Sequence, residues 1–413
     1  MKYTILILSI WIVAHQPAQA QALAQGPVKL TVSDCINRVL AHNPRLQAMR
    51  HRKQAMSDVM DDTRQLANPE LEVEWENFGG TGVLKDVEMG EHTFRISQPI
   101  EIGGKRRVRR ESAGLQFRVA ELQFLQERAA LVRDTRLAFI ATLHARDTRA
   151  LAADSLDRTR EMLGLVESLL QEGLVPESDK RKARLQVLNA QLRLETAGQA
   201  YDAALARLTS LWGNTGETTI ALQGELSLPA APSDDIPDNG MSETVSGLLL
   251  QTQVAVAEKE VELARKLRLP NLSIQAGYRT FHDTDEHAYV AGISLELPVF
   301  NTGRWKAGMA RARALETGAR IEAERLQLET DLQNTCRAIA RAYRSCVLLE
   351  QEMLPVATAE LAAARTAYRE GQYSYLEVLE SLRVWLDVRE KLSATLTAYA
   401  GLAAEQDYLL TRP

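Results

Sequence analysis

Two very long stretches of the chain contain no proline. One is the 67-residue stretch from Lys105 to Gln171, and the other is the 50-residue stretch from Arg304 to Met353. Beyond a single proline, Pro355, the second stretch continues to about Glu370. At 1.5 Å per residue, helices of these lengths extend about 75 to 100 Å. Such helices do not fit within a compact globule, so an elongated molecule is expected.

The apolar residues of the first stretch form two stripes with helical spacing. They are Phe117, Ala120, Phe124, Leu131, Ala138 and Ala141 in one stripe, and Leu115, Val119, Leu122, Ala129 and Val132 in the other. A displacement of two residues is about 200° around a helix, so the stripes lie on nearly opposite sides. This pattern is typical of the middle helix of a layered bundle or repeat array, and equally of a wall in which each helix touches two neighbours.

Four shorter segments alternate apolar and polar residues, as β-strands do. They are the segments 69–78, 91–99, 271–281 and 287–297. Their lengths match the roughly 9–11 residues of a tilted transmembrane β-strand. The segments form two pairs, joined by the polar or glycine-rich connections 79–90 and 282–286. Two membrane-length hairpins are therefore expected.

An internal repeat relates the two halves of the chain. Four landmarks recur after 198 to 201 residues: Pro69 and Pro270, Pro99 and Pro298, Gly104 and Gly303, and Gly173 and Gly371. We interpret this as a tandem duplication. The first repeat covers 21–212, with hairpin 69–99, long helix 105–171 and helix 176–212. A Gly/Pro/Ser/Asp-rich linker covers 213–240, and the second repeat covers 241–413, with hairpin 271–298, long helix 304–370 and helix 374–410.

The N-terminus has the features of a secretory signal peptide. Lys2 is followed by the apolar stretch 3–13 and by the small-residue cleavage site Ala18-Gln19-Ala20, which predicts removal of residues 1–20. The remaining chain carries a net charge of about −6 and no run of eighteen apolar residues. Export and mild acidity argue against a nucleic-acid partner, even though residues 105–110 read KRRVRR.

No catalytic constellation is recognisable. The three cysteines, Cys35, Cys336 and Cys346, have no repeated spacing, and the histidines form no HExxH or other paired metal spacing. We therefore expect no enzyme activity, no cofactor and no metal site. The segment 282–287 contains His282, Asp283, Asp285, Glu286 and His287. These residue types can ligate metal ions, but they are also ordinary in an external loop.

Four strands cannot close a membrane barrel, because the smallest closed barrels have about 8 strands and an open edge in lipid leaves backbone groups unpaired. If the strands span a membrane, the chain must oligomerise. The membrane would be the outer membrane of a bacterium. With long helices leaving the same hairpins, the expected product is a β-barrel continued into the periplasm by a helical barrel.

Three segments resemble those of the TolC-type outer-membrane efflux proteins. They are LTVSDCINRVLAHNPRL (30–46), AEKEVELARKLRLPNLSIQAGYR (257–279) and SQPIEIGGKRRVR (97–109). The last is similar to the form found in the cobalt-zinc-cadmium resistance (CzcC-like) branch. The second half lacks the Asn43-Pro44 pair of the first, a departure that concerns local structure.

The resemblance implies a fold of mixed α and transmembrane β structure, a homotrimer with a 12-stranded β-barrel and a long periplasmic α-helical barrel. It implies a passive exit duct for divalent heavy-metal cations, in contact with outer-membrane lipid, a periplasmic membrane-fusion adaptor protein and an inner-membrane pump of the resistance-nodulation-division class. A duct for drug efflux or type I protein secretion is the alternative within the family. A soluble periplasmic coiled-coil adaptor or scaffold is the alternative from a different class.

Three groups of residues are candidate functional positions. The adaptor-docking tips by resemblance are Gly173, Leu174, Val175, Gly371, Gln372 and Tyr373, although these glycines could equally serve only as helix caps. Asp179 and Glu377 form a pore constriction or, alternatively, are first-turn acids favoured by the helix dipole. The barrel-to-helix joints are Pro99, Gly103, Gly104, Pro298 and Gly303, and the basic residues beside the first joint face anionic headgroups or solvent.

Overall fold

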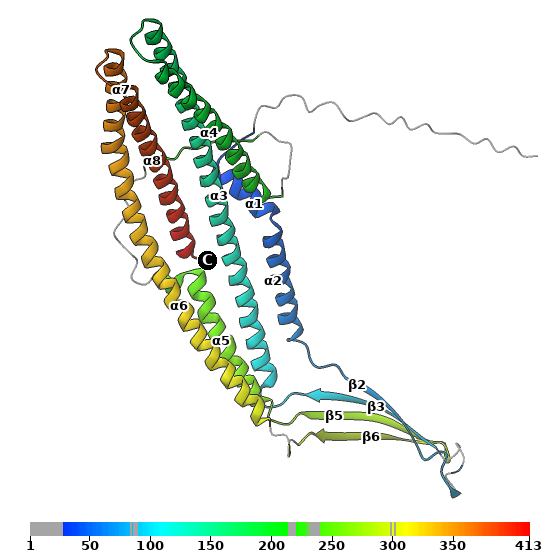
Figure 1. The fold of residues 1–413 in the computed structure, drawn as a ribbon. Coiled ribbons are helices and arrows are strands. Elements are labelled where there is room, and N and C mark those ends of the chain that lie inside the picture. Colours follow the sequence, from blue (N-terminus) through cyan, green and yellow to red (C-terminus); the bar gives the residue numbers. More distant parts are fainter. Residues whose placement is uncertain are drawn as a thin grey trace, which may run out of the picture.

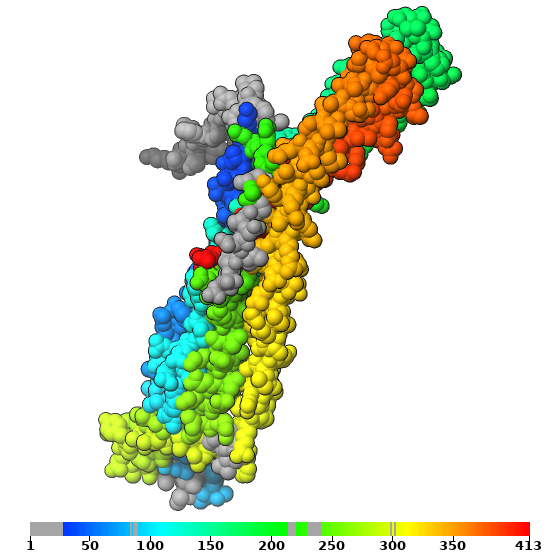
Figure 2. Space-filling view, turned by 90° about the vertical axis from the view of Figure 1, so that its left-hand side faces the viewer, coloured from blue at the N-terminus to red at the C-terminus, as the bar shows by residue number. Residues whose placement is uncertain are grey.

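The computed structural model describes residues 28–82, 85, 90–213, 220–228, 231, 240–297, 300 and 303–413. The expected signal peptide, Pro298 and much of the linker 213–240 lie outside these residues. The described chain is an elongated layer of helices with a β-sheet at one end and two helical tips at the other (Figures 1 and 2).

The helices and strands lie in the following order along the chain. In the first half they are β1 (Val28–Leu30), α1 (Val32–His42), α2 (Pro44–Asp62), β2 (Glu70–Glu76), β3 (Glu91–Ile100), α3 (Lys105–Gln171) and α4 (Glu177–Ser210). Between the halves lie β4 (Ile220–Leu222) and the 3₁₀-helix η3 (Gly240–Glu243). The second half contains α5 (Val245–Lys266), β5 (Leu272–Phe281), β6 (Glu286–Leu295), α6 (Arg304–Val347), the π-helical turn η4 (Leu348–Met353), α7 (Leu354–Arg369) and α8 (Tyr375–Leu409).

Helix α3 runs through the molecule as its central element. Near the sheet it packs between α2 and α5, and α6 packs on the other side of α5. Toward the tips it packs between α4 and α8, and α8 contacts α6 and α7. The two apolar stripes of α3 therefore contact neighbouring helices on both sides of α3 within a single layer, as in a wall of helices. Leu122 of one stripe and Leu131 of the other are both completely buried.

The middle of the molecule is held by a compact apolar core. Strand β1 pairs in parallel with β4, and both pack beside α1, α3 and the end of α4. The core contains Leu30, Cys35, Val39, Leu46, Leu131, Phe139, Leu143, Leu208, Trp212, Ile220 and Leu222. This cluster brings together segments that are nearly 200 residues apart in the sequence.

The helices are interrupted at two places. Helices α1 and α2 are separated at Asn43, whose Nδ2 donates to the carbonyl oxygen of Leu211 (2.7 Å) and whose Oδ1 accepts from the backbone N–H of Arg45 (2.8 Å). The long helix expected at 304–370 contains a π-helical turn. Pro355 has no N–H to donate to the carbonyl four residues earlier, and the Leu354 N–H bonds instead to Leu349, five residues back.

Candidate functional site

The four long strands form one antiparallel sheet in the order β2-β3-β5-β6. Residue pairs such as Trp75 with His92, and Tyr278 with Tyr289, place each row of side chains on one face. Three strands have ten residues each. A strand of that length, tilted by about 45°, spans roughly 23 Å, close to the ~25 Å apolar band of membrane barrels.

One face of the sheet is apolar and open. Its exposed side chains are Leu71, Val73, Trp75, Phe94, Ile96, Ile100, Ile274, Tyr278, Tyr289, Ile293 and Leu295. Tyr289 and Ile293 are 87% and 75% exposed. The aromatic residues gather toward the hairpin loops, as in the girdles at membrane interfaces. An apolar surface of this extent in water marks an interaction site, and strands of this length suit lipid.

The opposite face of the sheet is polar and predominantly acidic. Its charged residues are Glu70, Glu72, Glu74, Glu76, Glu91, Glu286, Arg95 and Arg279. Arg95 lies 2.9 Å from Glu72 and 3.5 Å from Glu74. Arg279 bridges Glu76 (3.0 Å) and Glu91 (2.9 Å). Six carboxylates against two guanidinium groups leave this face with a net negative charge.

The joint between β3 and α3 depends on two glycines and one buried lysine. Gly103 and Gly104 both have φ of +75°, and a Cβ on Gly103 would lie 2.2 Å from a methyl carbon of Leu269. Lys105, only 2% exposed, donates from Nζ to the Leu269 carbonyl (2.6 Å), the Asn271 Oδ1 (2.6 Å) and the Pro270 carbonyl (3.2 Å).

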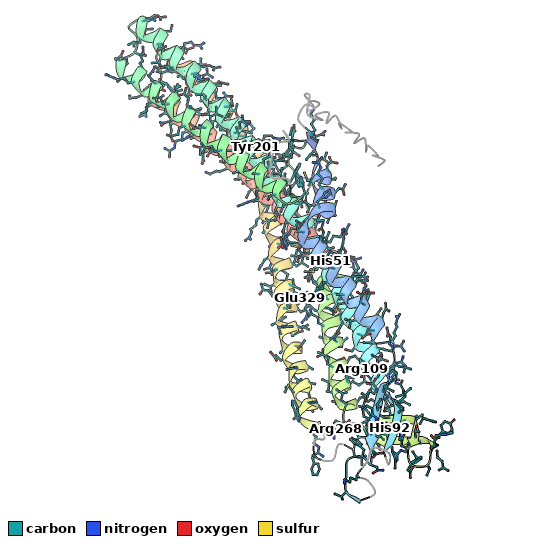
Figure 3. All side chains as sticks on the ribbon, turned by 90° about the vertical axis from the view of Figure 1, so that its right-hand side faces the viewer. His51, His92, Arg109, Tyr201, Arg268 and Glu329 are labelled. Atoms are coloured by element: carbon teal, nitrogen blue, oxygen red, sulfur yellow. The ribbon has the colours of Figure 1, made fainter. Side chains whose placement is uncertain are left out.

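The placement of Lys105 corrects the expectation that all basic residues of this segment face headgroups or solvent. Its ammonium group is enclosed because its three donors match three converging oxygens. Arg109 pairs with Glu101, whereas Arg107 remains largely exposed beside Glu111 (3.7 Å). In the other repeat, Gly303 has φ of +65° at the start of α6. Figure 3 places Arg109, Arg268 and His92 at this end of the molecule.

Both tips are helix caps of the Schellman type. In the first, the N–H of Leu174 donates to Leu169 (2.9 Å) and that of Gly173 to Leu170 (3.0 Å). In the second, the N–H of Gln372 donates to Ala367 (2.8 Å) and that of Gly371 to Tyr368 (3.1 Å). Both glycines have φ of +75°. Capping therefore accounts for their conformation, and adaptor docking remains a prediction.

The tips present apolar side chains to the outside. Leu174 is 66% exposed and Tyr373 is 41% exposed, while Val175 packs against the core beneath. Glu377 is engaged in a capping box, accepting from the backbone N–H of Ser374 (2.6 Å). Asp179 lies mostly covered at the start of α4, 3.2 Å from the Lys182 Nζ. The structure does not bring Asp179 and Glu377 into a direct contact among the described residues.

A pair of tyrosines, which sequence reasoning did not single out, lies between the two helical hairpins. Tyr368 and Tyr375 are 3% and 2% exposed, with ring centroids 5.9 Å apart. Burial, together with the charge of Asp179, raises the pKa of Tyr368 to about 12. Burial, Tyr368 and Asp179 also raise the pKa of Tyr375. The hydroxyl oxygen of Tyr368 is buried without a hydrogen-bond partner in the described structure.

The residues of the 282–287 segment do not gather into a metal centre. His282 contacts the His92 ring at 6.0 Å between centroids, and His287 stacks on Tyr278 at 5.4 Å. Within the described residues, no group of three His, Cys, Asp or Glu side chains has the arrangement of a metal site.

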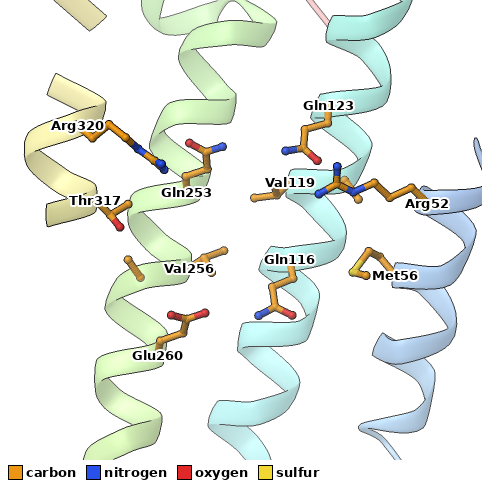
Figure 4. Close-up of a pocket in the computed structure, with 12 residues that line it drawn as sticks. Arg52, Met56, Gln116, Val119, Gln123, Gln253, Val256, Glu260, Thr317 and Arg320 are labelled. Atoms are coloured by element: carbon orange, nitrogen blue, oxygen red, sulfur yellow. The ribbon is translucent and has the colours of Figure 1, made fainter. Parts of the chain in front are cut away.

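The helical layer also carries an open groove of about 330 Å³ between α2, α3, α5 and α6 (Figure 4). Arg52, Gln116, Gln123, Glu260 and Arg320 contribute polar groups from α2, α3, α5 and α6. These side chains are spread along the groove and surround no common point (Figure 4). Among the described residues that line the groove, no hydrogen bond joins a nucleophilic side chain to a base.

Among the described residues, none of the helices has the length and apolarity needed to cross a membrane. The two-faced sheet and the long helices that continue from it define a class of outer-membrane channel proteins. The Outer membrane efflux protein family model matches residues 35–214 and 250–404. The chain belongs to this family.

Relatives and solved structures agree with this assignment. The chain is 24% identical to the cobalt-zinc-cadmium resistance protein CzcC of Cupriavidus metallidurans, over 94% of this chain and 91% of that protein. It is 25% identical to the nickel and cobalt resistance protein CnrC of the same species, over 67% of this chain and 65% of CnrC. The resemblance to the metal-resistance branch is confirmed.

The fold is that of known outer-membrane channels. The channel OprN superimposes with a TM-score of 0.81 at 17% identity, covering 92% of this chain and 90% of OprN. CusC superimposes with a TM-score of 0.75 at 18% identity, covering 95% of this chain and 96% of CusC. The protein is thus an outer-membrane efflux protein with a large periplasmic part.

Proposed function

We propose that three copies of this chain form the exit duct of a tripartite efflux system. The duct passively conducts divalent heavy-metal cations from a resistance-nodulation-division pump and its periplasmic adaptor to the cell exterior. The repeats 21–212 and 241–413 each supply one hairpin and one helical column to the wall, so three chains supply twelve strands.

The shape of the single chain supports an assembly. Strands β2 and β6 are the two edges of the sheet, and within the described chain each pairs on one side only. An edge strand in lipid leaves backbone groups unpaired, at a cost of several kcal/mol per group. Joining β6 of one copy to β2 of the next removes these edges and closes a barrel with its polar face inside.

The single observation that carries the choice of cargo is the charge of the polar sheet face. Its six carboxylates against two arginines favour cations over anions in a lumen. The relatives CzcC and CnrC, which are named for resistance to cobalt, zinc, cadmium and nickel, support metal cations as that cargo.

In this proposal the helical tips bind the adaptor, and the joints beside the sheet connect the barrel to the helices. The tips Gly173 to Val175 and Gly371 to Tyr373 receive the adaptor, with Leu174 and Tyr373 as exposed apolar contacts. Asp179 and Glu377, at the starts of α4 and α8, narrow the closed pore next to the tips. The joints at Pro99, Gly103, Gly104, Pro298 and Gly303 turn the chain from barrel to helix.

A soluble periplasmic scaffold would leave the apolar sheet face in water, which disfavours that alternative. Extraction of native membranes with and without detergent, followed by measurement of particle size, distinguishes the two classes of protein. We expect the duct to need detergent for extraction and to have the size of a trimer. Release without detergent as a monomer would reject it.

Deleting the gene tests the cargo. We expect lower tolerance to one or more of zinc, cobalt, cadmium, nickel and copper, restored by expression of the full chain. Unchanged tolerance to all five metals, together with new sensitivity to drugs, would favour the drug-efflux alternative. Loss of a secreted protein without either change would favour type I secretion.

A further inference from the structure

The buried Lys105 joins the two halves of one chain at the sheet-to-helix joint. It begins α3 and reaches across to the segment Leu269 to Asn271, which leads into β5. Strands β3 and β5 are neighbours in the sheet, so this contact closes the seam between the two repeats. The oxygens that receive it are two backbone carbonyls and one side-chain amide.

The internal repeat gives this contact a counterpart. Because Gly104 corresponds to Gly303, Lys105 corresponds to Arg304, the first residue of α6. Because Pro270 corresponds to Pro69, the accepting segment Leu269 to Asn271 corresponds to Asn68 to Glu70 at the entry to β2. The lysine and asparagine of the first seam are thus replaced by an arginine and a glutamate in the second.

In the single chain these two counterparts do not meet. Arg304 follows β6 and Glu70 begins β2, and these strands are opposite edges of the sheet (Figure 1). Both residues are exposed, and neither has an ion-pair partner in the described part of the chain. By contrast Glu72 and Glu74, on the same strand and face as Glu70, both lie beside Arg95.

We propose that Arg304 forms an ion pair with Glu70 of a second copy of this chain, and so closes the seam between subunits as Lys105 closes the seam within one. This proposal rests on the proposed trimer and names one contact between its neighbouring subunits. The guanidinium group bonds the carboxylate in two-pronged fashion and has further donors for the backbone carbonyls of Asn68 and Pro69.

The charges near Arg304 are consistent with an acceptor from outside the chain. The start of α6 carries Arg304, Lys306, Arg311 and Arg313 before its first acid, Glu316. Arg304 therefore has no acidic neighbour within its own first turns. Glu70, at the far edge, is the carboxylate of β2 that has no ion pair in the described structure, whereas Glu72, Glu74 and Glu76 have arginine partners.

A charge exchange tests the pair. We expect Glu70→Arg and Arg304→Glu each to lower the temperature at which the detergent-purified oligomer dissociates on a gel, and the double exchange to restore it. The matched control combines Glu72→Arg with Arg304→Glu, which should show no restoration because Glu72 is engaged by Arg95. Equal restoration in both double variants, or none in either, would overturn the proposal.

Cross-linking tests the contact even if the charge variants assemble poorly. Glu70→Cys and Arg304→Cys together, in a chain with Cys336→Ser, should give dimer and trimer bands with a short bifunctional thiol reagent, and neither single variant should. A cross-linked monomer would place the contact within one chain and reject the proposal. A wild-type protein that sizes as a monomer in detergent would reject the proposed duct instead, whereas an intact trimer without cross-links would reject this contact alone.

Discussion

At the residue scale, the tips depend on glycine for a backbone reason. Gly173 and Gly371 both have φ of +75°, and an added Cβ would meet no atom within 4 Å. A side chain has space there, so a substitution acts through the left-handed backbone, at about 1–2 kcal/mol per residue. The reversal of both hairpins is therefore sensitive to a change that disturbs no packing.

We predict that Gly173→Val together with Gly371→Val abolishes metal resistance while trimers still assemble. The strained backbone shifts the reversals that present Leu174 and Tyr373, whereas the packed helices of the proposed trimer are left unaltered by the substitutions. Growth on metal and particle size in detergent measure the two effects. Gly79→Val is the matched control, because Gly79 has φ of +70° and open space but lies in the hairpin loop at the opposite end. Full resistance in the double variant would show that the tips are not the docking site.

At the element scale, the sheet separates two environments by strand periodicity alone. On β6, Ile293 belongs to the apolar face and its neighbour Ser294 to the polar face, and both are exposed in the single chain. Adjacent residues thus face lipid and lumen in the proposed barrel. Exposure by itself does not distinguish the two, but the pairing register does.

We predict that Ile293→Arg prevents stable insertion into the outer membrane and that Ser294→Arg is tolerated. A lipid-facing arginine costs up to about 2–4 kcal/mol, depending on its depth in the bilayer. Membrane fractionation and resistance to heat dissociation are the measurements. Equal tolerance of both arginines would contradict the assignment of the faces.

At the scale of the whole molecule, the two helical hairpins meet around a core near the tips. Met162, Val166, Leu169 and Ala183 from the first hairpin pack with Ala364, Tyr368, Tyr375 and Val378 from the second. The tyrosines are the titratable part of this contact, with Asp179 beside them. The stability of this contact is therefore linked to pH at the alkaline end.

We predict that the contact between hairpins weakens as pH rises above about 10. Unfolded tyrosines lose their protons near pH 10, whereas folded Tyr368 keeps its proton to about 12. The unfolded state then binds fewer protons, so the free energy of unfolding falls by about 1.4 kcal/mol per pH unit in this range for each of the two tyrosines. Heat unfolding, followed by circular dichroism at several pH values, measures this decrease in stability. Tyr368→Phe should reduce this pH dependence and, by removing a buried unpaired hydroxyl, raise stability at neutral pH. An unchanged pH profile in this variant would contradict the prediction.

Sequence periodicity was informative wherever the physical signal is local. The absence of proline between Lys105 and Gln171 coincides with the bounds of α3, and the alternation of Leu71, Val73 and Trp75 coincides with one exposed face. The π-helical turn before Pro355 and the break at Asn43 were harder to predict from the sequence. A proline indicates an irregularity but not its form, and Asn43 is held by a residue 168 positions away.

The sequence by itself determined the elongated shape, the two hairpins and the family, because each depends on spacing along the chain. Only the tertiary structure decided the partners of charged residues. Lys105, in a run of five basic residues, is enclosed by three oxygens from the other repeat, while Arg304 at the equivalent position is open. The physical reason is that a buried charge depends on oxygens brought together by chain packing, and the residues that supply them lie far away in the sequence.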